Sequence, residues 1–202
     1  MKKNVFFILF LCVAIAVSAQ TGMKPKGSAG IGLFFADDFN GSINGQNRNF
    51  YNIGIFAYGD FIYAELICGL FFGGGTENFR FFGADLGIYG KYPFVISQGL
   101  SLFPLVGFEF LPVLYAKYNN MDFIEFFNGG ISGERHIDWK QFWFKAGCGL
   151  DCKLNQLFIL RFEALYGIRL RNNSSNELAN NTKLMINKSL GHGLSLRISM
   201  GI

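Results

Sequence analysis

The sequence has little charge, few cysteines and, beyond its first segment, no long apolar run. Charged residues make up 16% of the 202 positions. No segment after the N-terminal one contains the ~20 consecutive apolar residues that a transmembrane helix requires. Without residues 1–19, which carry two lysines, the net charge falls from +4 to about +2. These deficits argue against a helical membrane protein and against a nucleic-acid-binding protein.

Cysteines are too few, and too irregularly placed, for a disulfide framework. Three of the four lie after the first segment, at Cys68, Cys148 and Cys152. An odd number without a framework spacing argues against a small disulfide-stapled domain. Cys148 and Cys152 would lie about 13 Å apart on one strand, which is too far for a bridge. We expect all three to face outward as small apolar side chains.

The first segment has the features of a secretory signal peptide. Lys2 and Lys3 precede an apolar stretch from Val5 to Val17, and Ser18 and Ala19 supply small residues at a cleavage point. We therefore predict that residues 1–19 are a cleaved signal peptide and that residues 20–202 form one exported domain.

Glycine and phenylalanine are abundant, and apolar residues alternate with polar or small ones. In the last ten residues, Leu194, Leu196, Ile198, Met200 and Ile202 share one face, opposite glycine, serine and arginine. This period of two indicates strands. A parity break at Phe81-Phe82 predicts a bulge. The alternation predicts eight strands, near 27–36, 50–58, 61–72, 79–91, 99–113, 141–153, 160–170 and 193–202.

An even number of strands, most of them about 9–13 residues long, is typical of a small membrane barrel. The predicted connections 37–49, 114–138 and 171–190 are long and follow odd strands, whereas those after the second and sixth strands are tight. Outer-membrane barrels have short periplasmic turns and long outer loops. The sequence therefore predicts an all-β, eight-stranded antiparallel up-and-down transmembrane β-barrel whose three long loops lie on the same side.

Alternation alone would also fit a soluble barrel with its apolar face inside. The apolar face, however, carries more large side chains than an eight-stranded interior can hold. The polar face is rich in glycine, which makes room inside a narrow barrel but weakens a solvated strand. We therefore expect the polar face to point inward and the apolar face to meet lipid. Aromatic residues near the strand ends predict interfacial girdles, at Tyr51, Phe72, Phe79, Tyr115, Trp139, Phe142, Tyr58, Phe61, Tyr92 and Phe94.

The charges on the inward face are nearly balanced, and a desolvated lumen requires that each has a partner. Glu163 and Arg197 lie at similar heights on neighbouring strands, so we expect them to pair directly or through Arg161 or Lys145. Glu65 and Asp85 should complete the network. Its predicted members are Glu65, Asp85, Glu109, Lys145, Asp151, Arg161, Glu163, Arg169 and Arg197, with Lys91 and Lys153 as further bases. One hypothesis is a rigid electrostatic core, and the other is a relay or narrow gated pore.

Other candidate sites are weaker. His192 and Ser195 are three residues apart on a strand and should point to opposite faces, so they form no catalytic pair. The first loop resembles a calcium loop in its spacing but has Ile43 where glycine is expected, and turn chemistry explains its residues better. We predict no catalytic residue, no metal and no cofactor. The calcium-like positions are Asp38, Asn40, Ser42 and Asn44.

The chain resembles the small outer-membrane β-barrel proteins of Bacteroidetes, including the family named after PorT, and more distantly the OmpX/OmpA-transmembrane type. The resemblance covers about 27–202 and rests on the Ala19-Gln20 junction, the opening Lys26–Gly32 and the strand Tyr51–Tyr58. The chain departs from many barrels in ending on Ile202 rather than on an aromatic residue. The resemblance implies outer-membrane residence, and it supplies no catalytic residues.

Three functions follow as hypotheses. The first is a non-enzymatic, monomeric barrel in contact with outer-membrane lipid and lipopolysaccharide, whose loops at 37–49, 114–138 and 171–190 bind a surface ligand or adhere. The second is a narrow channel for small or apolar solutes. A lipid A-modifying enzyme is the least favoured of the three. The aromatic loop segment 123–127 suggests either packing over the barrel mouth or a contact surface.

Overall fold

The computed structural model describes residues 27–43, 46–75, 79–118, 121–124, 140–155, 157–173 and 191–202. Within these ranges, no helix is long and apolar enough to span a membrane. The strands are β1 (Ala29–Ile43), β2 (Gln46–Asp60), β3 (Ala64–Gly75), β4 (Arg80–Lys91), β5 (Phe94–Ser97), β6 (Leu100–Tyr118), β7 (Met121–Ile124), β8 (Lys140–Lys153), β9 (Ile159–Asn173) and β10 (Gly191–Gly201).

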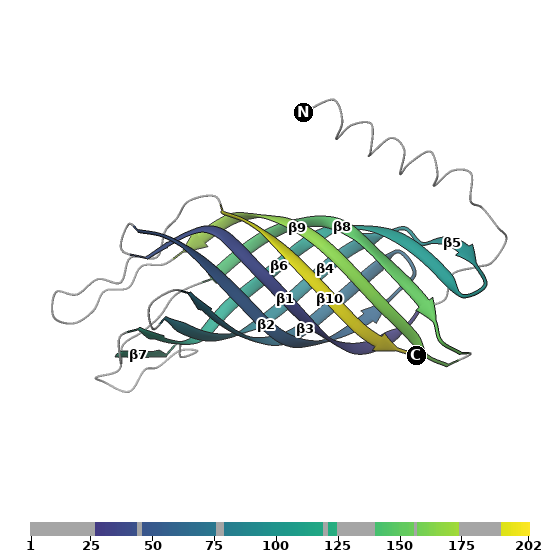
Figure 1. The fold of residues 1–202 in the computed structure, drawn as a ribbon, viewed down its shortest axis with the longest axis horizontal. Helices are drawn as coiled ribbons and strands as arrows, with labels where there is room; N and C mark the ends of the chain where they lie inside the picture. The colour runs from purple at the N-terminus through teal and green to yellow at the C-terminus, as the bar shows by residue number, and fades with distance from the viewer. Residues whose placement is uncertain are drawn as a thin grey trace, which may run out of the picture.

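Eight long strands form one closed antiparallel barrel, in which each strand pairs with the next along the chain (Figure 1). The short strands β5 and β7 each pair with β6 at one of its ends. The barrel closes where β10 pairs with β1, and Ala29 and Ile202 exchange backbone hydrogen bonds of 3.1 and 2.9 Å. The predicted eight-stranded antiparallel up-and-down barrel is therefore confirmed, including the pairing of the chain's last residue with the first strand.

The two ends of the barrel differ (Figure 1). At one, the short-turn end, lie the β2–β3 and β8–β9 connections and the C-terminus. At the other, the long-strand end, Pro112 on β6 pairs with Lys140 on β8, which pairs with Asn173 on β9. The connections that begin after β6 and after β9 therefore leave from the same end, as predicted. Residues 125–139 and 174–190 lie outside the described residues.

The prediction of a long loop over residues 37–49 was wrong. β1 runs to Ile43 and β2 begins at Gln46, so that most of this segment is an extended hairpin. The ladder shifts register between Asp38 and Gly41 and then continues to the pair of Ile43 with Gln46. The polar residues of this segment break the apolar alternation, so the segment was predicted to be a loop. A strand needs only backbone hydrogen bonds, however, and these form equally well where both of its faces are polar.

The predicted bulge at Phe81-Phe82 lies at the right height but on the other strand. β4 alternates without a break, and Phe81 and Gly83 both face inward. Phe82 pairs with Tyr115 and Gly83 with Val113, which leaves Leu114 of β6 as the extra residue. The sequence pattern misled because Phe81 is apolar and nevertheless points into the barrel.

A second irregularity in the same β4–β6 ladder is caused by proline. Pairing is present between Gly83 and Val113 and between Leu86 and Phe110, but it is interrupted between them, where Pro112 stands opposite Ala84. Proline has no N–H to donate to the neighbouring strand. The interruption therefore follows from the residue itself.

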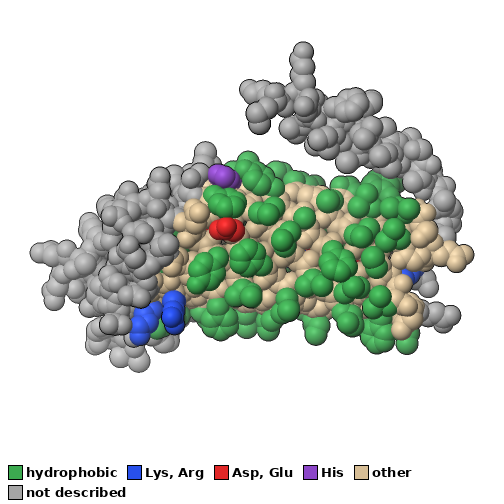
Figure 2. All heavy atoms as spheres, viewed as in Figure 1, with side chains coloured by type: hydrophobic (Ala, Val, Ile, Leu, Met, Phe, Trp, Pro, Cys, Tyr) green, Lys and Arg blue, Asp and Glu red, His purple; other side chains and the backbone are tan. Residues whose placement is uncertain are grey.

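The outer face is apolar over the full length of the strands (Figure 2). The inner face holds the charged and small residues, as predicted, and its glycines make room for long side chains. A Cβ on Gly167, for example, would lie 2.8 Å from Cγ of Lys145. Exposed apolar residues include Ile31, Leu33, Ile53, Ile55, Leu70, Ile88, Phe108, Phe162, Leu170, Leu196, Ile198 and Met200.

Candidate functional site

The barrel interior is the most unusual part of the molecule, because ionic side chains fill it. The structure buries eight of the nine predicted network residues, and Asp151 is half-buried. Lys91 is buried as well. Lys153, which was expected to face inward, is exposed because β8 ends there, at the short-turn end.

Arg161 is the centre of the network near the short-turn end. Its guanidinium donates to Glu65 Oε2 at 2.6 Å, to Asp60 Oδ2 at 2.8 Å and to Asp151 Oδ1 at 2.6 Å. Lys91 forms a further ion pair with Asp60. These contacts join β2, β3, β4, β8 and β9 across the lumen. One arginine with a planar set of donors can satisfy three carboxylates, which lysine cannot do in the same geometry.

Two aromatic rings sandwich this arginine, and a serine extends the network. The Arg161 guanidinium carbon lies 4.4 Å from the ring centre of Tyr58 and 5.0 Å from that of Phe103. Ser28 donates to Asp60 Oδ2 at 3.2 Å. Asp60 was missed by sequence reasoning because Tyr58-Gly59-Asp60 looked like a tight turn, whereas β2 continues through it. Tyr58, which was predicted to lie in an outer girdle, faces inward for the same reason.

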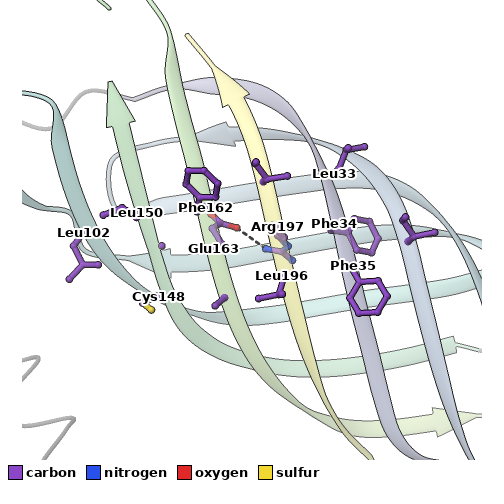
Figure 3. A pocket seen from close by; sticks show the side chains of 14 residues that line it. Leu33, Phe34, Phe35, Leu102, Cys148, Leu150, Phe162, Glu163, Leu196 and Arg197 are labelled. Carbon is purple, nitrogen blue, oxygen red and sulfur yellow. Dashed lines mark hydrogen bonds and ion pairs between the residues drawn. The ribbon is translucent and has the colours of Figure 1, made fainter. Parts of the chain in front are cut away.

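A second network occupies the middle of the lumen, and Glu109 is its centre. Arg197, Lys145 and the Tyr89 hydroxyl all contact the Glu109 carboxylate. Arg197 also donates to Glu163 Oε2 at 3.3 Å, so the predicted Glu163–Arg197 contact is present (Figure 3).

Lys145 and Arg197 each make one further contact with a neutral side chain. Lys145 donates to Ser195 Oγ at 2.8 Å. Arg197 donates to the Tyr89 hydroxyl at 3.0 Å. Charged and neutral partners together thus surround both cations, and neither points along an open axis.

Asp85, which was expected to complete the network, makes no direct contact with it, although the charges of Arg197 and Lys145 act on its carboxylate. Its side chain is 1% exposed, and within the described residues it forms no ion pair. Its Oδ1 atom has no hydrogen-bond partner. Asp85 lies in the stretch of β4 where the ladder to β6 is interrupted.

The long-strand half of the lumen is mainly aromatic. Phe50, Phe71, Phe79 and Phe81 are buried there, and Phe81 lies 5.4 to 6.1 Å, ring centre to ring centre, from the other three. We name these four residues the aromatic cluster. Phe79 was predicted to lie in an outer girdle, and its burial corrects that assignment.

Beside the aromatic cluster lies one ion pair, between Arg169 and Asp38. Asp38 was read as part of a turn or a calcium-like loop, but it belongs to β1 and points into the barrel toward Arg169. Strand parity could have identified it, since Phe34, Ala36 and Asp38 alternate with outward residues.

His192 and Ser195 do not form a nucleophile–base pair, because they lie on opposite faces of the barrel wall. Ser195 is buried in the lumen and accepts a hydrogen bond from Lys145. His192 lies on the outer face, where its ring packs against Phe39 at 5.5 Å and Tyr166 at 6.0 Å. A barrel wall therefore separates the two side chains.

The outer face has shallow apolar hollows between its large side chains. One, of about 530 Å³, crosses β10 and its neighbours, with Leu33 and Phe35 on one side and Cys148 and Ala164 on the other (Figure 3). Another, of about 720 Å³, includes Ala57, Cys68 and Ala84. Cys68 and Cys148 are exposed and Cys152 is half-buried, all without a disulfide. The three cysteines therefore face outward, as predicted.

Comparison with protein-family models and with curated proteins finds no match. Solved structures do match. Neisserial surface protein A (NspA) has a TM-score of 0.54 at 7% identity, covering 88% of this chain and 99% of that one. The N-terminal β-barrel domain of Pseudomonas aeruginosa OprF gives 0.37 at 15%, covering 85% and 99%, and Yersinia pestis Ail gives 0.38 at 13%, covering 88% and 98%. At this identity the likeness to NspA is one of fold, and the chain has the fold of a small eight-stranded antiparallel β-barrel.

Proposed function

We propose that the chain is an integral outer-membrane protein: a plugged, non-enzymatic β-barrel that presents its long connections for binding or adhesion. The proposal rests on the inside-out distribution of side chains, with charged residues in the lumen and apolar residues on the outer face. Arg161, Arg169 and Glu65 are each at most 1% exposed inside, while leucine, isoleucine and phenylalanine cover the outside. In water this distribution would cost free energy on both faces, whereas in a bilayer the outer face meets lipid.

Aromatic residues at both ends of the outer face support membrane insertion. Tyr51, Phe72 and Phe142 are exposed toward the long-strand end, and Phe61 and Tyr92 toward the short-turn end. Amphipathic rings at these two levels suit the two membrane interfaces.

A charge on the lipid face tests insertion directly. Ile198 lies outward near the middle of β10, so Ile198→Arg is expected to lower the free energy of unfolding in lipid vesicles by ~2–4 kcal/mol. Leu157, which is exposed in the β8–β9 connection, supplies the control, and Leu157→Arg is expected to cost ~0–1 kcal/mol. Equal losses in a urea titration would remove the basis for the membrane assignment.

The filled lumen supports a plug rather than a conduit. Arg161 bridges strands on opposite sides of the barrel, and the aromatic cluster occupies the lumen nearer the long-strand end. Purified full-length protein in planar bilayers should therefore show no steady single-channel current. The double variant Arg161→Ala/Phe103→Ala, which removes side chains from the lumen near the short-turn end, provides a matched comparison. A wild-type current that Arg197→Ala alters would instead support the narrow-channel alternative.

The connections that begin after β6 and after β9 leave the barrel at the long-strand end, where the outer part of the β1–β2 hairpin also lies. The predicted loops 114–138 and 171–190 begin with strand residues, up to Tyr118 of β6 and Asn173 of β9, and we propose that the segments that follow them bind the ligand. Replacing residues 176–189 by a short glycine-serine linker should reduce adhesion of cells that display the chain at equal surface density. It should leave the urea midpoint of the barrel unchanged. Unaltered adhesion, both for this variant and for one shortened within 125–138, would contradict the display role.

The proposal also includes cleavage of a signal peptide and membership of a family of barrels. Export would remove residues 1–19, so that N-terminal sequencing of the membrane form should begin at Gln20. The opening Lys26–Gly32 and the strand Tyr51–Tyr58 support a place among the PorT-like barrels of Bacteroidetes. The mature barrel would be monomeric and in contact with outer-membrane lipid and lipopolysaccharide.

A further inference from the structure

A polar site interrupts the lipid-facing surface of β1 and β10. Asp37 faces outward because Asp38 faces inward, and it is half-buried between Tyr51 of β2 and Leu194 of β10. Among the residues of the eight long strands whose burial the structure describes, it is the only acid on the outer face, and no ion pair between them involves it. In Figure 2 an acidic side chain and a nearby histidine interrupt the apolar face toward the long-strand end.

Asp37 lies at the level of the interfacial aromatic residues, because it pairs directly with Tyr51. A strand that rises about 3.3 Å per residue with a tilt of about 45° places Asp37 about 19 Å above Ala29, toward one edge of an apolar band about 25 Å tall. Phe35 and Phe39 flank Asp37 along the strand. A carboxylate at this level faces the lipid headgroups, and an ammonium headgroup is a cation that complements its charge.

Hydrogen-bonding and aromatic side chains lie on the same outer face near the level of Asp37. Tyr51 and Tyr166 are about half-exposed on the same outer face. His192 pairs with Phe39, one outward position beyond Asp37, and its ring packs on Tyr166. An ammonium group is attracted by a carboxylate and by the faces of tyrosine rings, and a histidine N–H can donate to a neighbouring phosphate.

The apolar hollow of about 530 Å³ begins directly below this polar group. Phe35, which lines the hollow, precedes Asp37 as the next outward residue of β1, and Leu196 lines it on β10. Cys148 and Ala164 pair across β8 and β9 and line the hollow, and both side chains are small. Its volume is in the range of small-molecule sites, which are about 300–1,000 Å³.

We propose that this surface is a binding site for one phosphoethanolamine lipid, with an acyl chain in the hollow and the ammonium on Asp37. The phosphate lies toward His192. The site rests on the proposed membrane function but goes beyond it, because it selects a headgroup. A phosphatidylglycerol headgroup would bring a negative charge to Asp37, and a choline headgroup has no N–H to donate to it.

Native mass spectrometry of the full-length protein tests this with equal amounts of phosphatidylethanolamine, phosphatidylglycerol and phosphatidylcholine of identical acyl chains. One phosphatidylethanolamine should remain bound in preference to the others. Asp37→Asn keeps the size of the side chain and should weaken that retention about tenfold. Ala164→Phe fills the hollow and should reduce retention of every lipid. Ala57→Phe is the matched control and should leave the preference intact, because Ala57 lines the neighbouring hollow of about 720 Å³ and not the one of about 530 Å³.

Equal retention of the three lipids, or an unchanged preference in Asp37→Asn, would overturn the proposal. So would a loss in Ala57→Phe as large as that in Ala164→Phe, because binding would then be spread over the whole belt. Folding of each variant is checked by the urea midpoint. The membrane assignment itself depends on Ile198→Arg, so a failure of lipid selection leaves that assignment standing.

Discussion

The two halves of the lumen are stabilised by different interactions. In the half near the short-turn end, Arg161 joins carboxylates from three strands. In the long-strand half, the aromatic cluster packs along β2, β3 and β4, and the single ion pair between Arg169 and Asp38 lies beside it. Charge therefore connects opposite walls in one half, whereas aromatic packing fills one wall in the other.

Glycine makes both solutions possible. A Cβ on Gly167 would lie 2.8 Å from the Lys145 side chain, and one on Gly83 would lie 2.8 Å from a ring carbon of Phe71. The narrow interior of an eight-stranded barrel accepts a long or large side chain only where a neighbour is missing. An inward glycine therefore predicts a bulky neighbour but does not reveal whether that neighbour is charged or aromatic.

The largest expected effect comes from removing the centre of the charged half. Arg161→Ala leaves Glu65 and Asp151 without an ion pair in the lumen, and it leaves Asp60 with Lys91 alone. Since breaking one buried pair typically costs ~3–5 kcal/mol, we expect a loss of at least about 5 kcal/mol. Urea unfolding in vesicles measures it, with Arg161→Lys as a charge-conserving comparison. A loss below about 1 kcal/mol would mean that the network does not stabilise this half.

Removing the centre of the aromatic half should cost somewhat less. Phe71 is fully buried, and truncating a buried phenylalanine typically costs ~3–5 kcal/mol, which we expect for Phe71→Ala. Phe71 and Arg161 share no partner, so the double variant should lose the sum of the two single losses to within about 0.5 kcal/mol. A larger coupling in the same urea experiment would show that the halves are not independent.

Within the middle network, the two acids should differ. Glu109 contacts Arg197, Lys145 and Tyr89, whereas Glu163 contacts Arg197 alone. Glu163→Ala leaves Arg197 paired with Glu109, so we expect a loss of only ~1–3 kcal/mol, against ~3–5 kcal/mol for Glu109→Ala. Matched urea titrations decide the order, and the reverse order would make Glu163 the centre of the network.

The sequence predicted the barrel well because strand parity is a strong constraint. A shift of one residue would move the whole apolar set of a strand to the other face, so Leu194, Leu196, Ile198 and Met200 together identify the outer face. The same rule placed Glu65, Glu109, Arg161 and Arg197 inside. It also predicted the contact between Glu163 and Arg197, which lie on neighbouring strands. It did not identify the contacts across the lumen, because these depend on barrel shear and side-chain reach rather than on position along one strand.

The wrong assignments have one cause: polar residues were assumed to face inward and apolar residues outward. Phe79, Phe81 and Tyr58 are apolar or aromatic and nevertheless lie inside. Asp38 and Asp60 are polar and were assigned to turns, although the strands continue through them. Near the barrel ends, parity counted from the strand centre is a better guide than side-chain type.

The smallest expected effect tests whether the long-strand half also opens more readily. Pro112 interrupts the β4–β6 ladder beside Asp85, and the inward Phe81 lies on the same strand of that seam. Pro112→Ala restores an N–H that can donate across the seam. This is worth about 0.5–1.5 kcal/mol, and the greater freedom of the unfolded chain offsets about 0.4–1 kcal/mol of it. Global stability should therefore change by less than about 1 kcal/mol.

The local effect of Pro112→Ala should be clearer than the global one. Amide hydrogen exchange at Ala84 and Leu86 reports opening of the seam, and both amides should exchange more slowly in the variant. Pro104→Ala is the matched control, because Pro104 lies beyond the last β4–β6 pair, that of Lys91 with Leu105. Amides beside Arg161 should be unaffected in either variant, since the charged half shares no hydrogen bond with this seam. If exchange slowed equally in both halves, opening would be a property of the whole barrel, and the contrast between its halves would be one of composition alone.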